Sequence, residues 1–386
     1  MSEALEDRPR GVGLYVHWPY CARICPYCDF NVVRARGREA EGARLGEAIL
    51  ADLEAQAGLI GPRPLASIFL GGGTPSLMPP DLAARIIARA RALFPADEVE
   101  VTLEANPTDA ETARYAAFAE AGINRLSLGL QSLDDDALKF LGRDHSAAEG
   151  VRAVRAGQAA FGRVSVDLIY ARPGQSEQDW HDELARAIDL GPEHVSPYQL
   201  TIEPRTAFGR AFARGTLRPP EEDAAADLYE ATQAGLEAAG FEAYEVSNHA
   251  RGVAARSAHN LHVWRGGDYL GLGPGAHGRL TLNGVRTATV AHRAVNGYAA
   301  GVEAGQPWSE REPLTPRDAA EERLLLGLRT VEGAPMSLLA TLGLSVGTSP
   351  AADLMADGFL TVTNNRLVAT ARGRPVLDGV LKALLV

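Results

Sequence analysis

The chain has 386 residues, more than one hydrophobic core usually holds, so we expect one large domain with one or two smaller additions. Its net charge of −11 disfavours nucleic acid as a partner. The sequence contains neither a run of about 18 apolar residues that could span a membrane nor a secretory signal, so we expect a cytoplasmic protein that is not an integral membrane protein.

The first predicted strand, residues 13–18, leads into a loop that holds all three cysteines, Cys21, Cys25 and Cys28. Three thiolates this close in sequence can converge on one soft metal centre, either an iron–sulfur cluster or zinc. A four-iron cluster held by three cysteines leaves one iron open to an external ligand. Zinc would need a fourth ligand, for which His17 is the candidate, but structural zinc sites usually combine cysteine pairs from separate turns. A disulfide is less favoured, because the number of cysteines is odd.

Apolar runs then alternate with amphipathic helical patterns. The predicted strands are residues 13–18, 67–70, 99–104, 125–130, 164–170 and 194–200. The predicted helices are residues 41–59, 82–94, 111–121, 135–160 and 177–190. Six strand–helix units indicate parallel strands joined by crossover helices, in either a partial barrel or an open doubly wound sheet.

Glycine or acidic residues follow the second and third strands, where the chemistry of a parallel barrel gathers. After the second strand comes Gly71-Gly72-Gly73-Thr74, and glycines let the main chain approach a ligand closely, although a plain tight turn is the alternative. Glu104 ends the third strand. Its carboxylate could accept hydrogen bonds from hydroxyl or amine groups of a ligand, or it could be a capping or surface acid.

Three further polar residues follow the same pattern in the next two units. Gln131 lies at the end of the fourth strand, and Arg143 follows it. The planar guanidinium suits a carboxylate, whereas an exposed salt bridge is the ordinary alternative. Asp167 stands in an otherwise apolar strand and needs a ligand, a cation or a hydrogen-bond network, because burying an unpaired charge is costly.

The spacing Cys-x3-Cys-x2-Cys after a first strand resembles that of the radical S-adenosylmethionine superfamily. In that superfamily the methionine group of the cofactor occupies the open iron, and one electron from the cluster releases a 5′-deoxyadenosyl radical. The flanking residues, Tyr-Val-His-Trp-Pro-Tyr-Cys and Cys-Pro-Tyr-Cys-Asp-Phe, resemble the oxygen-independent coproporphyrinogen III oxidase-like group and, within it, the heme chaperone branch. The resemblance runs from Tyr15 to the C-terminus.

The resemblance implies an α/β fold, with a partial (β/α)6 radical-SAM barrel over residues 13–218 after an N-terminal tail, residues 1–12. It implies a [4Fe–4S] cluster on the three cysteines and a bound S-adenosylmethionine. The residues that it assigns to the adenosylmethionine pocket are Tyr15, Tyr27, Gly72, Gly73, Thr74, Glu104, Gln131, Arg143 and Asp167. Thr201, after the sixth strand, matches the family pattern more loosely and is added to this set.

Residues 219–313 are expected to form an additional α+β segment, an accessory region over the barrel mouth. It holds five of the nine histidines, in a tract rich in glycine and aromatic residues. Histidine with aromatic neighbours suits heme, although a single histidine is more often a satisfied core or loop residue. The tract resembles the family's His-Asn-x3-Trp segment, which makes His259 and Trp264 heme candidates. His262-Val263 stands where an Asn-Tyr pair is common in the family.

Residues 314–386 are predicted to form a small winged-helix-like module of three helices, a hairpin turning at Asn364-Asn365, and a last helix. The module is not conspicuously basic, so we expect it to pack against the barrel rather than bind DNA. The apolar stripe of the last helix is expected to face a core, with a membrane surface as the alternative. The residues of this stripe are Val376, Leu377, Val380, Leu381 and Leu384.

Two features separate the branches of the family. The oxidases carry a further cysteine two residues beyond the third, where this chain has Phe30, and an N-terminal extension for which there is no room before Cys21. We therefore expect a heme chaperone that holds heme or a related tetrapyrrole and passes it to an acceptor apoprotein, with membrane-bound hemoproteins among the candidates. The alternatives are an oxygen-independent coproporphyrinogen III oxidase, which decarboxylates propionate side chains by radical chemistry, and a structural zinc-binding scaffold.

Overall fold

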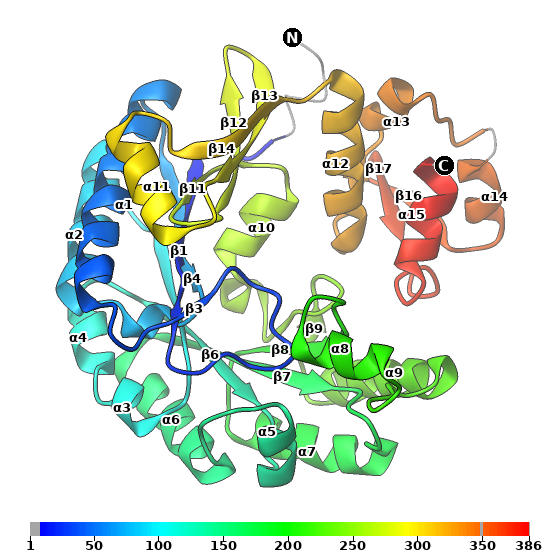
Figure 1. Ribbon diagram of the computed structural model, residues 1–386. Coiled ribbons are helices and arrows are strands. Elements are labelled where there is room, and N and C mark those ends of the chain that lie inside the picture. The colour runs from blue at the N-terminus through cyan, green and yellow to red at the C-terminus, as the bar shows by residue number, and fades with distance from the viewer. Residues whose placement is uncertain (1–7, 348–349, 386) are drawn as a thin grey trace.

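Six parallel strands form the centre of the fold and stand side by side in chain order (Figure 1). The computed structural model describes residues 8–347 and 350–385, so residues 1–7 of the expected N-terminal tail lie outside the described residues. The six strands are β1 (Val12–Trp18), β4 (Leu65–Gly72), β5 (Glu100–Ala105), β6 (Arg125–Gln131), β7 (Arg163–Tyr170) and β8 (His194–Gln199). Each starts within two residues of its predicted start, and the prediction of six parallel units is confirmed.

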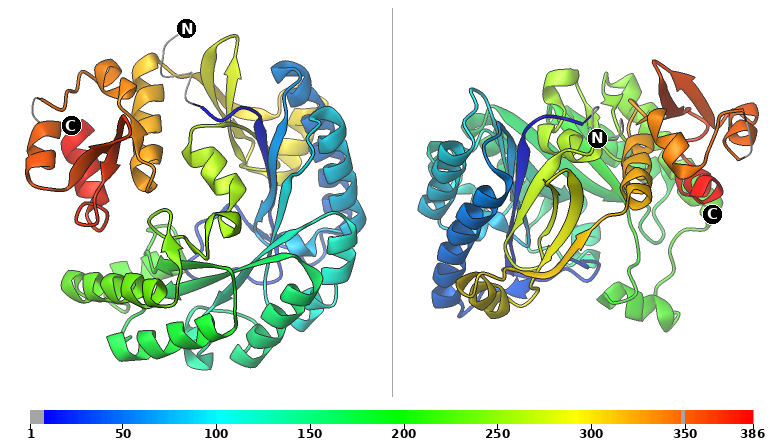
Figure 2. Two further views of the ribbon diagram at one scale, coloured as in Figure 1. Left: turned by 180° about the vertical axis from the view of Figure 1, so that it is seen from behind. Right: turned by 90° about the horizontal axis from the view of Figure 1, so that it is seen from above.

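Helices cover the outer face of this curved sheet (Figures 1 and 2). They are α1 (Glu39–Ile60), η2 (Pro75–Leu77), α2 (Pro80–Leu93), α3 (Asp109–Thr112), α4 (Tyr115–Glu120), α5 (Asp135–Phe140), α6 (Ala147–Ala160) and α7 (Glu177–Asp189). The prediction of one helix over residues 111–121 and one over residues 135–160 was wrong, because the structure has two helices, α3 and α4, in the first range and two, α5 and α6, in the second. The second break has a local cause: Gly142 has φ +68°, and Ser146 caps α6 with a reciprocal bond to Glu149.

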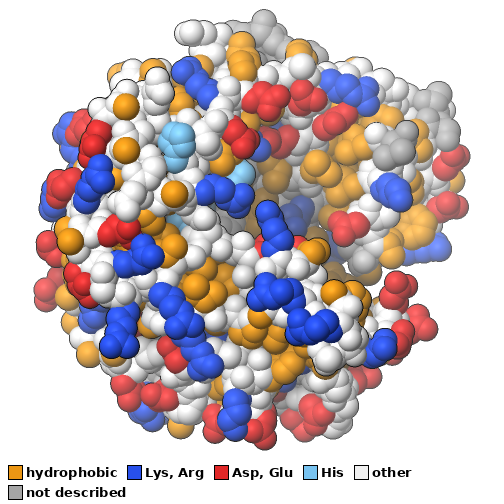
Figure 3. Space-filling view, in the orientation of Figure 1, with side chains coloured by type: hydrophobic (Ala, Val, Ile, Leu, Met, Phe, Trp, Pro, Cys, Tyr) orange, Lys and Arg blue, Asp and Glu red, His pale blue; other side chains and the backbone are white. Residues whose placement is uncertain are grey.

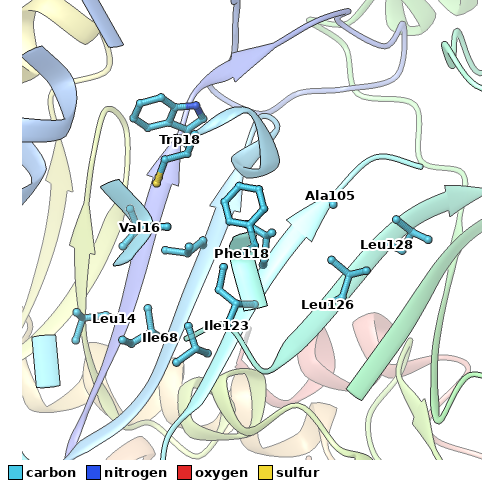
Figure 4. Close-up of a cluster of buried hydrophobic side chains, with 14 of the residues drawn as sticks. Leu14, Val16, Trp18, Ile68, Ala105, Phe118, Ile123, Leu126 and Leu128 are labelled. Carbon is cyan, nitrogen blue, oxygen red and sulfur yellow. The ribbon is translucent and has the colours of Figure 1, made fainter. Parts of the chain in front are cut away.

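The main core lies between the sheet and these helices. Leu14, Val16 and Trp18 of β1 are buried, as are Ile68 of β4 and Leu126 of β6 (Figure 4). Burying one such aliphatic side chain contributes about 1.5–3 kcal/mol, so this continuous cluster holds the strands in register. Register matters here because it decides which strand-end residues face one another.

The chain after β8 adds strands to both edges of the same sheet. Beside β1 lie β11 (Asp268–Leu272), parallel to it, and then the antiparallel β12 (His277–Leu282), β13 (Val285–Ala291) and β14 (Trp308–Pro313). Beside β8 lie the short β10 (His249–Ala250) and β9 (Glu242–Ala243), which complete 12 strands. The connecting helices are α8 (Ala207–Ala213), α9 (Glu222–Ala238), η3 (Val253–Ala255), α10 (Ala258–Trp264) and α11 (Val295–Glu303). Among them, α10 lies on the inner side of the curve (Figure 1).

The C-terminal module has its own core and stands beside the main body (Figure 2). Its elements are α12 (Pro316–Arg329), β15 (Ala334–Pro335), α13 (Ser337–Leu342), α14 (Ala351–Ala356), β16 (Leu360–Thr363), β17 (Arg366–Ala369) and α15 (Leu377–Leu385). Asn364 and Asn365 have φ of 51° and 58°, which the predicted tight hairpin requires. Leu377, Val380 and Leu384 are buried and Leu381 packs against the same core, so most of the apolar stripe faces the core, whereas Val376 is 48% exposed.

None of the helices described here combines the length and apolar composition needed to cross a bilayer. We retain residues 13–218, 219–313 and 314–386 as proposed units, with the sheet running without a break from the first unit into the second.

Candidate functional site

The loop that carries the cysteines is tied to the glycine turn after β4. The Gly73 N–H donates to the Trp18 carbonyl at 2.8 Å, and the Thr74 N–H donates to the Tyr20 carbonyl at 2.9 Å. A second tie is the short parallel pair of β2 (Tyr20–Cys21) and β3 (Val33–Arg34). The loop is therefore held at its start and at its end.

All three thiols line one cavity of about 450 Å³, here called the cysteine cavity. Cys21 is buried, whereas Cys25 and Cys28 are partly exposed. Burial raises the pKa of the Cys21 thiol to about 11, and a hydrogen bond with Thr74 opposes the shift. Metal binding would therefore have to displace a proton from this thiol.

The glycine turn leaves no room for side chains. A Cβ on Gly73 would lie 2.9 Å from the Cys21 sulfur and 2.8 Å from the Pro19 carbonyl oxygen. Gly72 has φ +113°, and a Cβ there would lie 2.7 Å from His17 Nδ1. The glycines thus allow two segments of the protein to pack together, in addition to lining the cavity.

Arg143 connects the elements around the cavity from the loop between α5 and α6. Its guanidinium donates to Gly129 O at 3.0 Å and to Asn106 Oδ1 at 2.5 Å, and lies 3.4 Å from the Cys25 sulfur. Although burial alone would lower the pKa of Arg143, the nearby Tyr27 hydroxyl and Cys25 thiol raise it overall. Arg143 Nε is buried without a partner in the described chain. The result is a fixed positive charge beside one of the three cysteines.

Two carboxyl groups, Glu104 and Asp167, lie in the same cavity. The Gly72 N–H donates to Glu104 Oε2 at 3.1 Å, and the Ser127 hydroxyl donates to Asp167 Oδ2 at 3.2 Å. Burial, followed by the nearby Asp167, raises the pKa of Glu104 to about 8. Burial also raises the pKa of Asp167, against a hydrogen bond with Ser196. Asp167 therefore has the hydrogen-bond network that its place in an apolar strand led us to expect.

The structure brings most of the predicted cofactor residues together around the cysteine cavity. Those lining it are Tyr27, Gly72, Gly73, Thr74, Glu104, Gln131, Arg143, Asp167 and Thr201. Thr201 is exposed. Gln131 has φ +53°, and its side-chain oxygen is buried without a partner in the described residues. Tyr15 is not among these residues, because its side chain lines an adjoining cavity.

Sequence reasoning missed Asn106 and Ser127. Asn106 bridges two of the predicted residues, since it donates to Thr74 Oγ1 at 3.0 Å and accepts from Arg143. Its position two residues beyond Glu104, directly before a proline, was the available signal. Ser127 lies inside β6 and gave no signal of its own.

The adjoining cavity, of about 520 Å³, is here called the aromatic cavity because Tyr15, Phe69, Trp264 and Tyr269 line it. It shares four lining residues with the cysteine cavity, which are Asp29, Phe30, Glu104 and Tyr198. The two cavities therefore meet at Glu104 of β5 and Tyr198 of β8, beside residues 29–30 of the cysteine loop.

His259 also lines the aromatic cavity. Its Nδ1 lies 2.8 Å from the Ser67 hydroxyl, its ring centroid lies 5.0 Å from that of Phe69, and Nε2 makes no hydrogen bond within the described residues. Burial lowers the pKa of His259 to about 3, so the imidazole is neutral at physiological pH. His262 differs, because its Nε2 lies 2.8 Å from the Asp268 carbonyl oxygen and its ring packs against Gly13 and Gly267.

His17 is not available as a zinc ligand. Its Nδ1 lies 3.0 Å from the Tyr15 hydroxyl and its Nε2 lies 2.8 Å from the Asn31 carbonyl oxygen, so both ring nitrogens are engaged. Within residues 8–347 and 350–385, no three His, Cys, Asp or Glu side chains are placed to hold a single metal ion. The two hydrogen bonds of the His17 ring weaken the zinc alternative. Three thiols lining one larger cavity fit a bulkier thiolate-bound group better.

The donor set of the cysteine cavity fits an iron–sulfur cluster with a polar organic ligand beside it. Soft thiols stand at one end, and the unpartnered Gln131 oxygen and Arg143 Nε lie in the surrounding wall. Groups of this kind could bind the amino and carboxylate groups of a ligand, because unpaired buried polar atoms are costly.

Comparison with known proteins agrees with this geometry. Residues 15–187 match the radical SAM superfamily, and residues 314–376 match the HemN C-terminal domain. The solved structure of coproporphyrinogen III oxidase (HemN) from Escherichia coli matches with a TM-score of 0.81, covering 98% of this chain and 91% of that one. At 21% identity this match shows the fold alone.

Curated relatives are more similar in sequence. Radical S-adenosyl methionine domain-containing protein 1, mitochondrial, from Bos taurus is 40% identical over 96% of this chain and 87% of that protein. The heme chaperone HemW of Mycobacterium tuberculosis is 38% identical over 97% and 94%, and that of Escherichia coli is 34% identical over 97% and 98%. The chain therefore belongs to the radical S-adenosylmethionine superfamily and, within it, to the family with a HemN C-terminal domain that includes HemW.

Proposed function

We propose that this protein is a heme chaperone, which holds heme beside an iron–sulfur cluster and passes it to an acceptor protein in the cytoplasm. The main support is that relatives named heme chaperone HemW are similar over almost the full length of both chains. The aromatic cavity supports the same proposal, because a neutral histidine with a free Nε2 stands there among aromatic side chains.

Membership of the radical SAM superfamily implies a [4Fe–4S] cluster and S-adenosylmethionine. We assign the cluster to Cys21, Cys25 and Cys28. Bound together, the two groups supply one-electron cleavage of a carbon–sulfur bond. Arg143 would neutralise negative charge beside Cys25 and, with Gln131, orient the polar end of the adenosylmethionine.

We assign heme to the aromatic cavity, with His259 as its ligand and Trp264 against its face. The Ser67 hydroxyl would fix the orientation of the imidazole through Nδ1, leaving Nε2 for the iron. Because the two cavities share Glu104 and Tyr198, heme and adenosylmethionine would lie next to each other.

Decarboxylation of coproporphyrinogen III is the competing function. The fold is shared with HemN, but similarity of fold alone does not carry an activity. Position 30 holds an exposed phenylalanine in place of the further cysteine expected of the oxidases.

An anaerobic heme titration of the cluster-reconstituted protein tests the proposal. We expect a near-stoichiometric complex that survives gel filtration, and a His259→Ala variant that retains at least tenfold less heme. His249→Ala is the matched control, because His249 is buried elsewhere and its Nε2 lies 3.0 Å from Gln233 Oε1. No retained heme, together with turnover of coproporphyrinogen III, would instead establish the oxidase.

A further inference from the structure

Two segments that flank the cysteine cavity carry an excess of arginine. Residues 21–36 contain three arginines and one acid, Asp29, and residues 203–214 contain three arginines and one acid, Glu203. The whole chain, by contrast, has a net charge of −11. We call these side chains the arginine face, and they are Arg23, Arg34, Arg36, Arg205, Arg210 and Arg214.

The two segments lie against each other. The Phe208 N–H of α8 donates to the Pro26 carbonyl of the cysteine loop at 2.9 Å, and the rings of Tyr27 and Phe208 lie 6.4 Å apart. Figure 3 shows Lys and Arg side chains gathered across the centre and lower centre of the molecule, over this loop and α8. Helix α8 therefore lies against the same loop that carries Arg23 near its start and Arg34 and Arg36 at its end.

The arginine face has no partner within the described parts of the chain. All six side chains are exposed, and none forms an ion pair with an acid there. Arg23 and Arg210 donate only to backbone carbonyls. Phe30 and Phe212 are 62% and 51% exposed among them. Unpaired arginine with exposed aromatic side chains is the composition of a protein-binding surface.

This surface is also where the thiols come nearest to solvent. Cys25 and Cys28 are partly exposed in the loop that carries Arg23, and Arg23 itself lines the cysteine cavity. The cluster proposed above must gain an electron from outside, because the heme proposed for the aromatic cavity is cargo that is passed on rather than a resident electron donor. A donor that approached the outer face of the sheet would meet the helices that cover it.

We propose that the arginine face is the docking surface for an acidic electron-carrier protein. The inference rests on the proposed function. The carrier, a protein with a reduced flavin or a low-potential iron–sulfur centre, loses one electron, and the cluster gains it. Opposite charges bring the two proteins together quickly and reversibly, and raised ionic strength weakens the encounter.

The test measures binding and electron transfer separately. An acidic flavodoxin serves as the probe. Its affinity for the protein is measured by titration at about 20 mM and at about 300 mM salt. The rate of cluster reduction is then measured by rapidly mixing reduced flavodoxin with the oxidised, cluster-loaded protein. The variant is Arg210→Glu with Arg214→Glu. Its matched control is Arg91→Glu with Arg155→Glu, which reverses two exposed arginines on α2 and α6.

We expect the Arg210/Arg214 variant to lose at least tenfold in affinity and in reduction rate at low salt, and the control to lose less than twofold. Both should be reduced by dithionite at the wild-type rate, which distinguishes failure of docking from failure of the cluster itself. Arg36→Glu, placed in the other segment, should weaken binding in the same direction while leaving α8 unaltered.

The proposal would be overturned if the Arg91/Arg155 control lost as much affinity and reduction rate as the Arg210/Arg214 variant. It would also be overturned if the affinity for flavodoxin did not change with salt. Binding of the arginine face to vesicles of anionic phospholipid with no affinity for the flavodoxin would overturn it as well, because the face would then be a membrane-contact surface.

Discussion

Glu104 shows at the scale of one residue how the site depends on protonation. Its carboxyl group lies where the two cavities meet, and burial, followed by Asp167, raises its pKa from 4.5 to about 8. The folded protein therefore holds a proton that the unfolded chain releases above pH 4.5. The stability due to this proton is full below that pH and is lost as the pH rises through 8.

We therefore predict that Glu104→Gln flattens the decline in unfolding free energy of the metal-free protein between pH 5 and pH 8. The difference in slope from wild type should approach about 1.4 kcal/mol per pH unit at most. Urea denaturation at several pH values measures it. Glu98→Gln, an exposed acid before β5, is the control, and identical slopes for wild type and Glu104→Gln would contradict the prediction.

Gly73 gives a second prediction at this scale. In Gly73→Ala the new methyl group would overlap the Cys21 sulfur and the Pro19 carbonyl, both less than 3.0 Å away, so the cysteine loop must move. We expect a loss of about 1–3 kcal/mol in stability and a lower iron content after reconstitution.

Gly58→Ala is the matched control for this change. Gly58 lies in α1 with open space around its Cα, so the same substitution should stabilise the protein by about 0.5–1 kcal/mol. Normal iron content in Gly73→Ala would show that the close approach is unnecessary.

At the scale of elements, α12 joins the C-terminal module to the accessory region through Glu245. This carboxylate is fully buried and accepts from Arg329 at 2.5 Å and from the Ser247 N–H at 2.7 Å. The Val331 N–H also donates to the Tyr244 carbonyl at 3.2 Å. Glu245 is thus one of several contacts that hold the module, beside the ion pairs of Arg265 with Glu332 and of Arg279 with Glu322.

Glu245→Gln should loosen this attachment. The neutral amide keeps the shape but weakens the bond with Arg329, which is 38% exposed, so we expect a loss on the order of 1 kcal/mol. Hydrogen exchange of residues 316–329 should become faster, while exchange of β4 to β7 stays unchanged. Equal protection of α12 in both proteins would mean that other contacts hold the module.

Elements formed by long apolar runs could be predicted from the sequence, and those formed by tertiary contacts could not. The strands β5, β6 and β7 place an apolar residue at every second position, whereas β9 and β10 have two residues each and pair only with each other and with β8. The break before α6 depends on Gly142, whose Cβ would meet Pro26 at 2.5 Å, a contact across 116 residues.

The dependence on tertiary contacts also explains which site residues could be predicted from the sequence. Residues at the ends of β5, β6 and β7 could be predicted to meet, because parallel strands end at one edge. Tyr15 lines a different cavity from the other predicted residues because the aromatic cavity is completed by β11 and α10, which sequence patterns did not place beside β1.

At the scale of the whole molecule, the two largest hydrophobic cores of the described residues are separate, one under the sheet and one in the C-terminal module. All four tryptophans lie before residue 314, so intrinsic fluorescence follows the main body, whereas circular dichroism follows helices in both parts. We predict that urea unfolding monitored by the two methods will not coincide, and that the module will unfold first because its core is smaller. A single coincident transition would show that the cores unfold as one unit.

The pairing of β1 with β11 has a consequence for synthesis of the chain. Val16 pairs with Leu272, so the strand that leads into the cysteines leaves the ribosome long before its second neighbour exists. At translation rates of about 5–20 residues per second, this interval lasts roughly 13–50 s. During that time the three thiols follow a strand that lacks its β11 neighbour, and they are accessible to chaperones, oxidants or a cluster-delivering protein. We therefore expect loading of the proposed cluster to compete with closure of the sheet during synthesis of the chain.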